Sequence, residues 1–139
     1  MTKKEFRVYM FLPSERERTL RWIERLEKKL SDIPTVKTKV QSSQKEYPYV
    51  MTHVTVDAPE PVRADSIRKD LRRAHNRLTA IERRLDKLDS MIATVEDSRT
   101  RQILTERYLE GRKLKDVALR FDLTDQWVMR LINEAIKNF

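Results

Sequence analysis

The strongest constraint on the fold is a regular stripe of apolar residues from about Asp65 to Val95. Apolar side chains recur there at alternating spacings of four and three residues, which a helix places on one face. The segment therefore predicts one long helix with a heptad repeat. The heptad positions that we expect to mediate oligomerisation are Ile67, Leu71, Leu78, Ile81, Leu85, Leu88 and Ile92.

Two arrangements can bury this stripe. The residues flanking it favour a parallel coiled coil between two or more copies, because no facing pair would bring like charges together. The alternative is antiparallel packing against residues 14–33 of the same chain, whose apolar residues also form one stripe. We expect a homo-oligomer, a dimer or larger. The facing pairs in the parallel arrangement would be Asp70–His75, Arg77–Glu82 and Arg84–Asp89.

An amphipathic helix is expected before this segment, within residues 1–34. Ser14 and Glu17 have the spacing of a capping box, so we expect the helix to begin after Pro13. Pro34 would end it, because proline has no amide hydrogen.

The segment between the two helices, residues 35–64, is rich in β-branched residues and tyrosine. Alternation of side chains predicts either a short β-hairpin, 36–40 against 49–56, or an extended arm that acts as a linker. The whole chain is thus predicted to be mostly α-helical, with its domains at residues 1–34, 35–64, 65–96 and 97–139.

Composition removes most enzyme classes. The chain has no cysteine, one glycine and two histidines, which excludes thiolate metal sites, glycine-rich phosphate loops and multi-histidine sites. We therefore expect no catalytic residue, no metal and no cofactor. No segment has the apolar length of a membrane span, and none fits a signal peptide, so a cytoplasmic location in a bacterial host is expected. The net charge of +8 favours a polyanionic partner.

Residues 97–139 have the layout of a helix-turn-helix. Asp97 or Ser98 can cap a helix that runs to about Glu110, with Gly111 just beyond its end. A short second helix follows, and Thr124 can cap a third that reaches the end of the sequence. The residues expected to pack between the last two helices are Ala118, Phe121, Leu123, Val128 and Leu131.

The third helix carries a polar line opposite its apolar side. Gln126, Arg130, Asn133 and Lys137 follow spacings of four, three and four. Glutamine and asparagine can bind adenine, and arginine can bind guanine, in the major groove. The alternative is an ordinary solvated face. For Trp127, packing on the first helix of the motif is expected over a contact with a partner.

The sequence "LTERYLEGRKLKDVALRFDLTDQWVMRLINEAI" resembles the fourth region of bacterial sigma factors. Together with a helical amino-terminal part and a middle arm, it is similar to small phage regulators of the RinA/ArpU type. By resemblance, the base-contacting positions fall on Asp125, Gln126, Met129 and Arg130, to which the polar line adds Asn133. Sigma factors commonly carry arginine where this chain has Asp125 and Met129, so their promoter specificity does not transfer.

Phosphate contacts are expected from the basic entry to the second helix and from nearby polar groups. These candidates are Arg112, Lys113, Lys115, Arg120, Thr124 and Lys137.

The expected function is that of a phage or prophage transcriptional regulator, an activator of late or packaging genes, that reads double-stranded DNA with its last helix. Contact with RNA polymerase is implied by resemblance. Two alternatives remain: a DNA-packaging subunit similar to a small terminase, and a coiled-coil adaptor that binds RNA polymerase without touching DNA.

Overall fold

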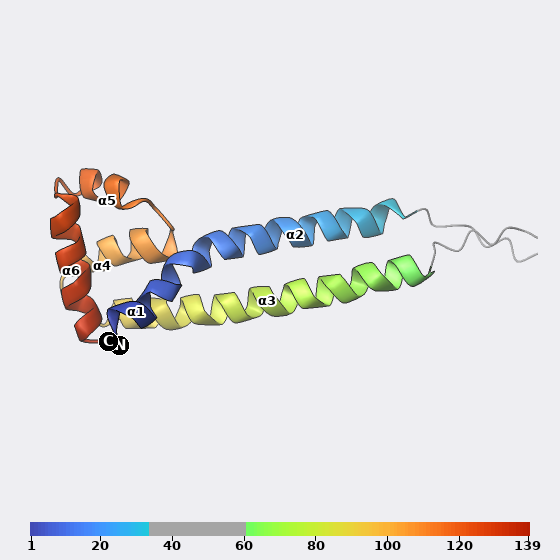
Figure 1. Cartoon of the computed structure of the whole chain (residues 1–139), viewed down its shortest axis with the longest axis horizontal. Coiled ribbons are helices and arrows are strands. Elements are labelled where there is room, and N and C mark those ends of the chain that lie inside the picture. Colours follow the sequence, from blue (N-terminus) through green and yellow to red (C-terminus); the bar gives the residue numbers. More distant parts are fainter. Residues whose placement is uncertain (34–60) are drawn as a thin grey trace, which may run out of the picture. The chain divides into compact units, whose positions relative to one another are not determined.

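The computed structural model describes residues 1–33 and 61–139, and every regular element within those ranges is a helix (Figure 1). The predicted hairpin or arm lies outside the described residues, except for 61–64. These four residues form the first turn of a helix, so the predicted linker is wrong there; Pro61 suits a first helical position because no amide hydrogen is needed. The elements are α1 (Lys3–Phe6), η1 (Arg7–Phe11), α2 (Leu12–Asp32), α3 (Pro61–Ala93), α4 (Ser98–Leu104), η2 (Thr105–Leu109), α5 (Leu114–Arg120) and α6 (Asp125–Lys137).

The described residues fall into two compact units. Unit 1 contains residues 1–21 and 76–139, and unit 2 lies within residues 22–75. Helices α2 and α3 each contribute to both units. In unit 2, apolar side chains of the two helices are buried, namely Ile23 and Leu26 of α2 and Ala64, Ile67 and Ala74 of α3.

Within unit 1, the start of α2 also packs on α3. Leu12 shares a buried cluster with Ile81 and Leu88, and the Arg16 Nε lies 3.6 Å from the Glu82 Oε1. Within this unit, the start of α2 and the end of α3 run antiparallel (Figure 1). The chain therefore buries much of the heptad stripe against itself, which is the alternative arrangement. Pairing between copies stays a prediction, and the stripe residues still half-exposed for it are Leu71, Leu78 and Leu85.

The amino terminus is more structured than predicted. The expected capping box at Ser14 is wrong, because α2 already begins at Leu12 and the Ser14 hydroxyl donates to the Phe11 carbonyl at 3.0 Å. A capping box is instead formed by Thr2 and Glu5 at the start of α1. The Thr2 amide donates to the Glu5 carboxylate at 2.8 Å, and this bond is the main reason that the pKa of Glu5 is lowered.

Phe6 joins the amino terminus to the end of the chain. Its ring is completely buried and meets the Tyr108 ring edge-on, with centroids 4.7 Å apart. The Phe139 ring lies 5.7 Å away on the same cluster, and the Met1 amino group donates to the Phe139 carbonyl. Helix α1 therefore packs on α6 and closes the core of unit 1 (Figure 1).

The first helix of the predicted helix-turn-helix is confirmed, with one irregular turn. The Asp97 side chain accepts from the Thr100 amide and caps α4. The helix then widens into the π-helical η2, where the Glu110 amide donates to the Thr105 carbonyl at 3.0 Å. Gly111 follows with a φ of 71°, the left-handed conformation that favours glycine.

Gly111 also contacts the amino-terminal part of unit 1, and this contact limits which side chain the position can carry. A Cβ atom at Gly111 would lie 3.0 Å from the Cβ of Pro13.

The turn between α5 and α6 is tight. Asp122 adopts a φ of 54°, which aspartate tolerates better than most residues. The Leu123 amide donates to the Ala118 carbonyl at 2.9 Å, and the Thr124 hydroxyl accepts from the Trp127 amide at 3.2 Å as the predicted cap. Val128 and Ile132 of α6 are fully buried behind this turn.

The role of Phe6 can be measured through stability. We expect Phe6→Ala to lower the free energy of unfolding by about 3–5 kcal/mol, because the cavity lies at the centre of the aromatic cluster. Phe11→Ala is the matched control, since the Phe11 side chain is 62% exposed and its loss should cost less than about 0.5 kcal/mol. Urea unfolding followed by circular dichroism measures both. Equal losses for the two variants would contradict the central place given to Phe6.

Candidate nucleic-acid interface

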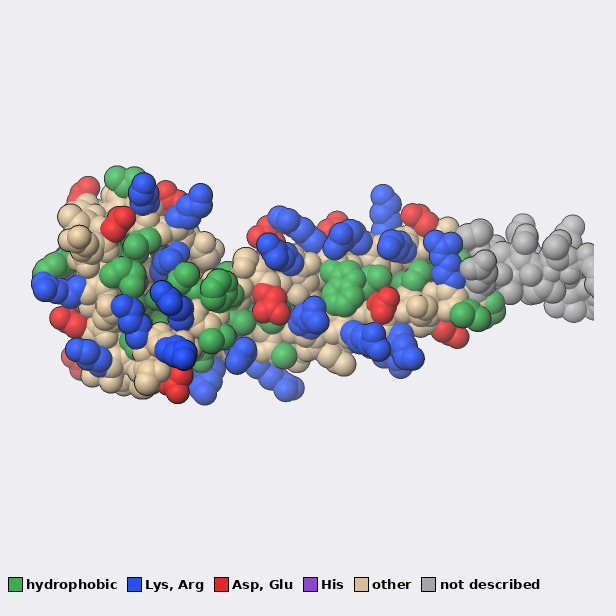
Figure 2. All heavy atoms as spheres, viewed as in Figure 1, with side chains coloured by type: hydrophobic (Ala, Val, Ile, Leu, Met, Phe, Trp, Pro, Cys, Tyr) green, Lys and Arg blue, Asp and Glu red, His purple; other side chains and the backbone are tan. Residues whose placement is uncertain are grey.

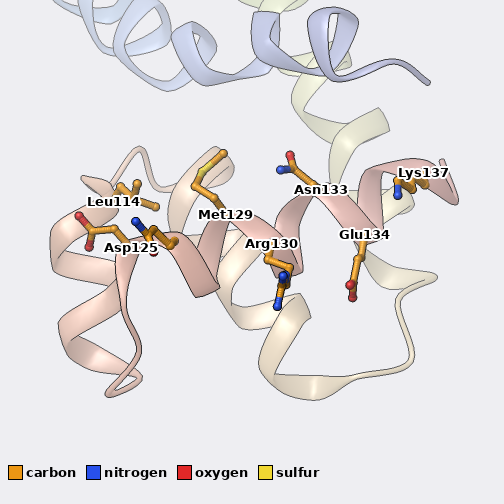
Figure 3. A pocket seen from close by; sticks show the side chains of 8 residues that line it. Leu114, Asp125, Met129, Arg130, Asn133, Glu134 and Lys137 are labelled. Atoms are coloured by element: carbon orange, nitrogen blue, oxygen red, sulfur yellow. The ribbon is translucent and has the colours of Figure 1, made fainter.

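The outer face of α6 is open to solvent and slightly hollowed (Figure 3). Thr124 fixes where the helix begins, and burial of one side of the helix fixes its rotation. Gln126, Arg130 and Lys137 of the polar line therefore face outward. The residues lining this face are Leu114, Asp125, Gln126, Met129, Arg130, Asn133, Glu134 and Lys137.

All five predicted base-contacting residues lie on this face. Asp125, Gln126 and Arg130 are exposed, and Met129 is half-buried. Asn133 differs, because its amide oxygen is buried and has no hydrogen-bond partner among the described residues. Figure 3 shows its side chain pointing toward the amino-terminal helices, at the edge of the face.

Trp127 is not packed as the sequence predicts. Its side chain is 41% exposed, and the Arg130 guanidinium carbon lies 5.6 Å from the centre of the indole ring. A cation over an indole face is attracted by the ring's quadrupole. The tryptophan therefore supports Arg130 from the side and helps to hold it at the surface.

The predicted phosphate contacts divide into exposed cations and paired ones. Lys113 and Lys115 are exposed at the start of α5, and Lys137 is exposed on α6. The Arg112 Nε lies 2.9 Å from a Glu110 carboxylate oxygen at the surface. Thr124 is exposed and caps α6, so a phosphate beside its hydroxyl would lie at the positive end of that helix. Figure 2 shows Lys and Arg side chains spread over the face of unit 1 that carries α6.

Arg120 has an internal partner. Its guanidinium donates to Glu106 at 2.8 Å, and the Glu106 side chain is only 7% exposed. The other oxygen of that carboxylate is buried and has no hydrogen-bond partner among the described residues. A buried carboxylate needs a cation close by, so Arg120 holds α5 to the π-helical turn η2.

Sequence reasoning missed three contributors. Leu114 and Glu134 also line the face. The helical period of α6 could have predicted the position of Glu134, because it places this residue away from the buried side of the helix. The amino-terminal helices also reach this region, through Lys3 and Arg7, which line a pocket with Met129 and Asn133. No local signal in the sequence points to that contact.

The pKa shifts in unit 1 follow its packing. Burial raises the pKa of Tyr108, and the nearby Arg107 and Arg7 oppose that rise. The hydrogen bond from the Thr100 hydroxyl, at 2.6 Å, is the main cause of the lowered pKa of Asp97. Tyr108 therefore stays neutral in the core, and Asp97 stays ionised at the start of α4.

Three helices with a tight turn, an exposed polar face on the last one and a basic surround define a helix-turn-helix of the DNA-binding class. Comparison with protein families agrees: residues 97–138 match region 4 of sigma-70. The match covers α4, η2, α5 and α6 and confirms the sigma-like character expected of this segment. No curated protein and no solved structure matches the chain significantly. None of the described helices is long and apolar enough to cross a membrane.

The pairing of Arg120 predicts a structural rather than a phosphate-binding role. Arg120→Met should lower the free energy of unfolding by about 1–3 kcal/mol, because it leaves the Glu106 carboxylate buried without its cation. A double variant, Glu106→Met with Arg120→Met, should recover most of that loss. Thermal unfolding compares the variants, and DNA titrations at several salt concentrations provide the second measurement. A salt dependence lowered by about 0.9 in log–log slope for Arg120→Met would instead make Arg120 a phosphate contact.

Proposed function

We propose that the protein is a sequence-specific DNA-binding transcriptional regulator that inserts α6 into the major groove. The observation that carries the proposal is the solvent-exposed face with Gln126 and Arg130, on a motif whose family match is a sigma factor region. Figure 3 shows Arg130 and Glu134 pointing away from the amino-terminal helices.

The chemistry of recognition is divided between two helices. Gln126 can bond an adenine edge with both atoms of its amide, and Arg130 can bond the two acceptors of a guanine. Lys113 and Lys115 lie at the start of α5, where this motif meets the backbone, and neutralise phosphates. Asp125 and Glu134 are acidic residues on the same face. Each disfavours binding of the duplex in a wrong register, or accepts a hydrogen bond from a cytosine amino group.

The proposed setting is a phage or prophage regulator of the RinA/ArpU type that acts in the bacterial cytoplasm and activates late or packaging genes. Its support is the combination of a sigma-like module in residues 97–138 with further helices that precede it in the sequence. Activation would come from contact with RNA polymerase near the bound site. The protein would act by binding alone, with no catalytic step and no cofactor.

Base reading can be tested once a site is known. Selection from a random duplex library yields the preferred sequence, and fluorescence anisotropy then measures affinity for it and for a scrambled duplex. Gln126→Ala and Arg130→Ala should each cost about 1–3 kcal/mol on the selected site and relax preference at one position. Lys113→Gln should weaken both duplexes alike and lower the salt slope by about 0.9.

Arg25→Ala is the control, because it removes one exposed arginine from α2 in the other unit. It should leave site preference unchanged. If the α6 variants bind DNA as the unaltered protein does, the regulator proposal fails and an adaptor that works without DNA gains.

Self-association is part of the proposal, because two readers double the contacts on repeated half-sites. The half-buried Leu71, Leu78 and Leu85 of α3 are the residues available for it. Light scattering should give at least twice the chain mass of 16.7 kDa, and Leu78→Lys should shift the protein toward monomer. A monomer at the concentrations that occupy the selected site would exclude oligomerisation.

A further inference from the structure

Two basic side chains of the amino-terminal segment lie beside the proposed reading helix. Lys3 and Arg7 line a pocket of about 340 Å³ together with Met129 and Asn133 of α6 and Leu114 of α5. Both basic residues are exposed, and neither forms an ion pair within the described residues. Two unpaired cations are therefore held at one edge of the α6 face.

This pocket adjoins the α6 face. Leu114, Met129 and Asn133 line both of them. Figure 3 shows Met129 and Asn133 pointing toward the amino-terminal helices, whereas Arg130 and Glu134 point to the opposite side of α6. The amino-terminal segment therefore borders the same flank of α6 as the start of α5.

The segment is anchored rather than loosely attached. Lys3 and Arg7 are four residues apart and lie near each other on the helical turn, and between them Phe6 is buried against Tyr108. Glu5, which lies between them in the sequence, accepts a hydrogen bond from the Thr2 amide. The backbone that carries the two cations is thus fixed, so little backbone freedom is lost when they bind an anion.

We infer that Lys3 and Arg7 contact backbone phosphates along the flank of the groove that α6 enters, in addition to the contacts proposed for Lys113 and Lys115 of α5. The inference rests on the proposed function, and it extends the interface beyond residues 97–138, which match the sigma region. Arginine can bind a phosphate with two parallel hydrogen bonds, and lysine binds it as a point charge. These contacts position the protein and carry no sequence information.

The test uses the full chain with the selected duplex and with a scrambled duplex of equal length. Affinities are measured across a series of salt concentrations for Lys3→Gln/Arg7→Gln. The control is Lys28→Gln/Lys29→Gln, which removes the same charge from exposed positions of α2 in unit 2. Lys113→Gln reports on the proposed DNA interface independently. Circular dichroism and urea unfolding verify that each variant is folded.

The expected result is a salt slope lowered by about 1.8 for the Lys3/Arg7 variant on both duplexes, since each lost phosphate contact removes about 0.9. The ratio of affinities for the two duplexes should not change. The control should keep the original slope. A slope for the Lys3/Arg7 variant equal to that of the control overturns the inference, provided that Lys113→Gln lowers it. If none of the three variants alters the slope, the proposed DNA interface itself is wrong.

Discussion

The packing of Phe6 against Tyr108 and Phe139 is the interaction on which unit 1 depends. A module of some forty residues has little apolar area to bury, and small domains are marginal for that reason. Here the missing area comes from the opposite end of the chain, where Phe6, Tyr9 and Leu12 enter the same core as α4 and α6. The helix-turn-helix is therefore completed by residues that lie outside the sigma-like segment.

The local signals of the carboxyl-terminal motif were enough to predict its helices. Asp97 and Thr124 are caps, and Gly111 has the left-handed conformation that its place after a helix predicts. At the amino terminus two capping boxes compete, one at Thr2 and one at Ser14, and both satisfy the same spacing. The structure forms the first, and the second is absent because helical turns already precede Ser14 and bring Phe6 into the core. A local pattern carries no information on that distant contact.

The candidate face was predictable from the helical period of α6, which places Gln126 and Arg130 away from the side that carries Val128 and Ile132. The partners of individual side chains were not. The sequence predicts Arg120 as a phosphate contact, whereas the π-helical turn η2 places Glu106 beside it as an internal partner. The heptad stripe likewise fits α2 of the same chain and a second copy equally well, because burial of apolar area does not depend on which surface provides it.

The bond between the Met1 amino group and the Phe139 carbonyl has a practical consequence for anyone who studies this protein. An affinity tag or fluorophore attached at either end would start from the same spot, close to Lys3. A polyhistidine extension there would add or shield charge next to α1 and α6. Tag-free material is therefore the proper starting point for electrophoretic or calorimetric work.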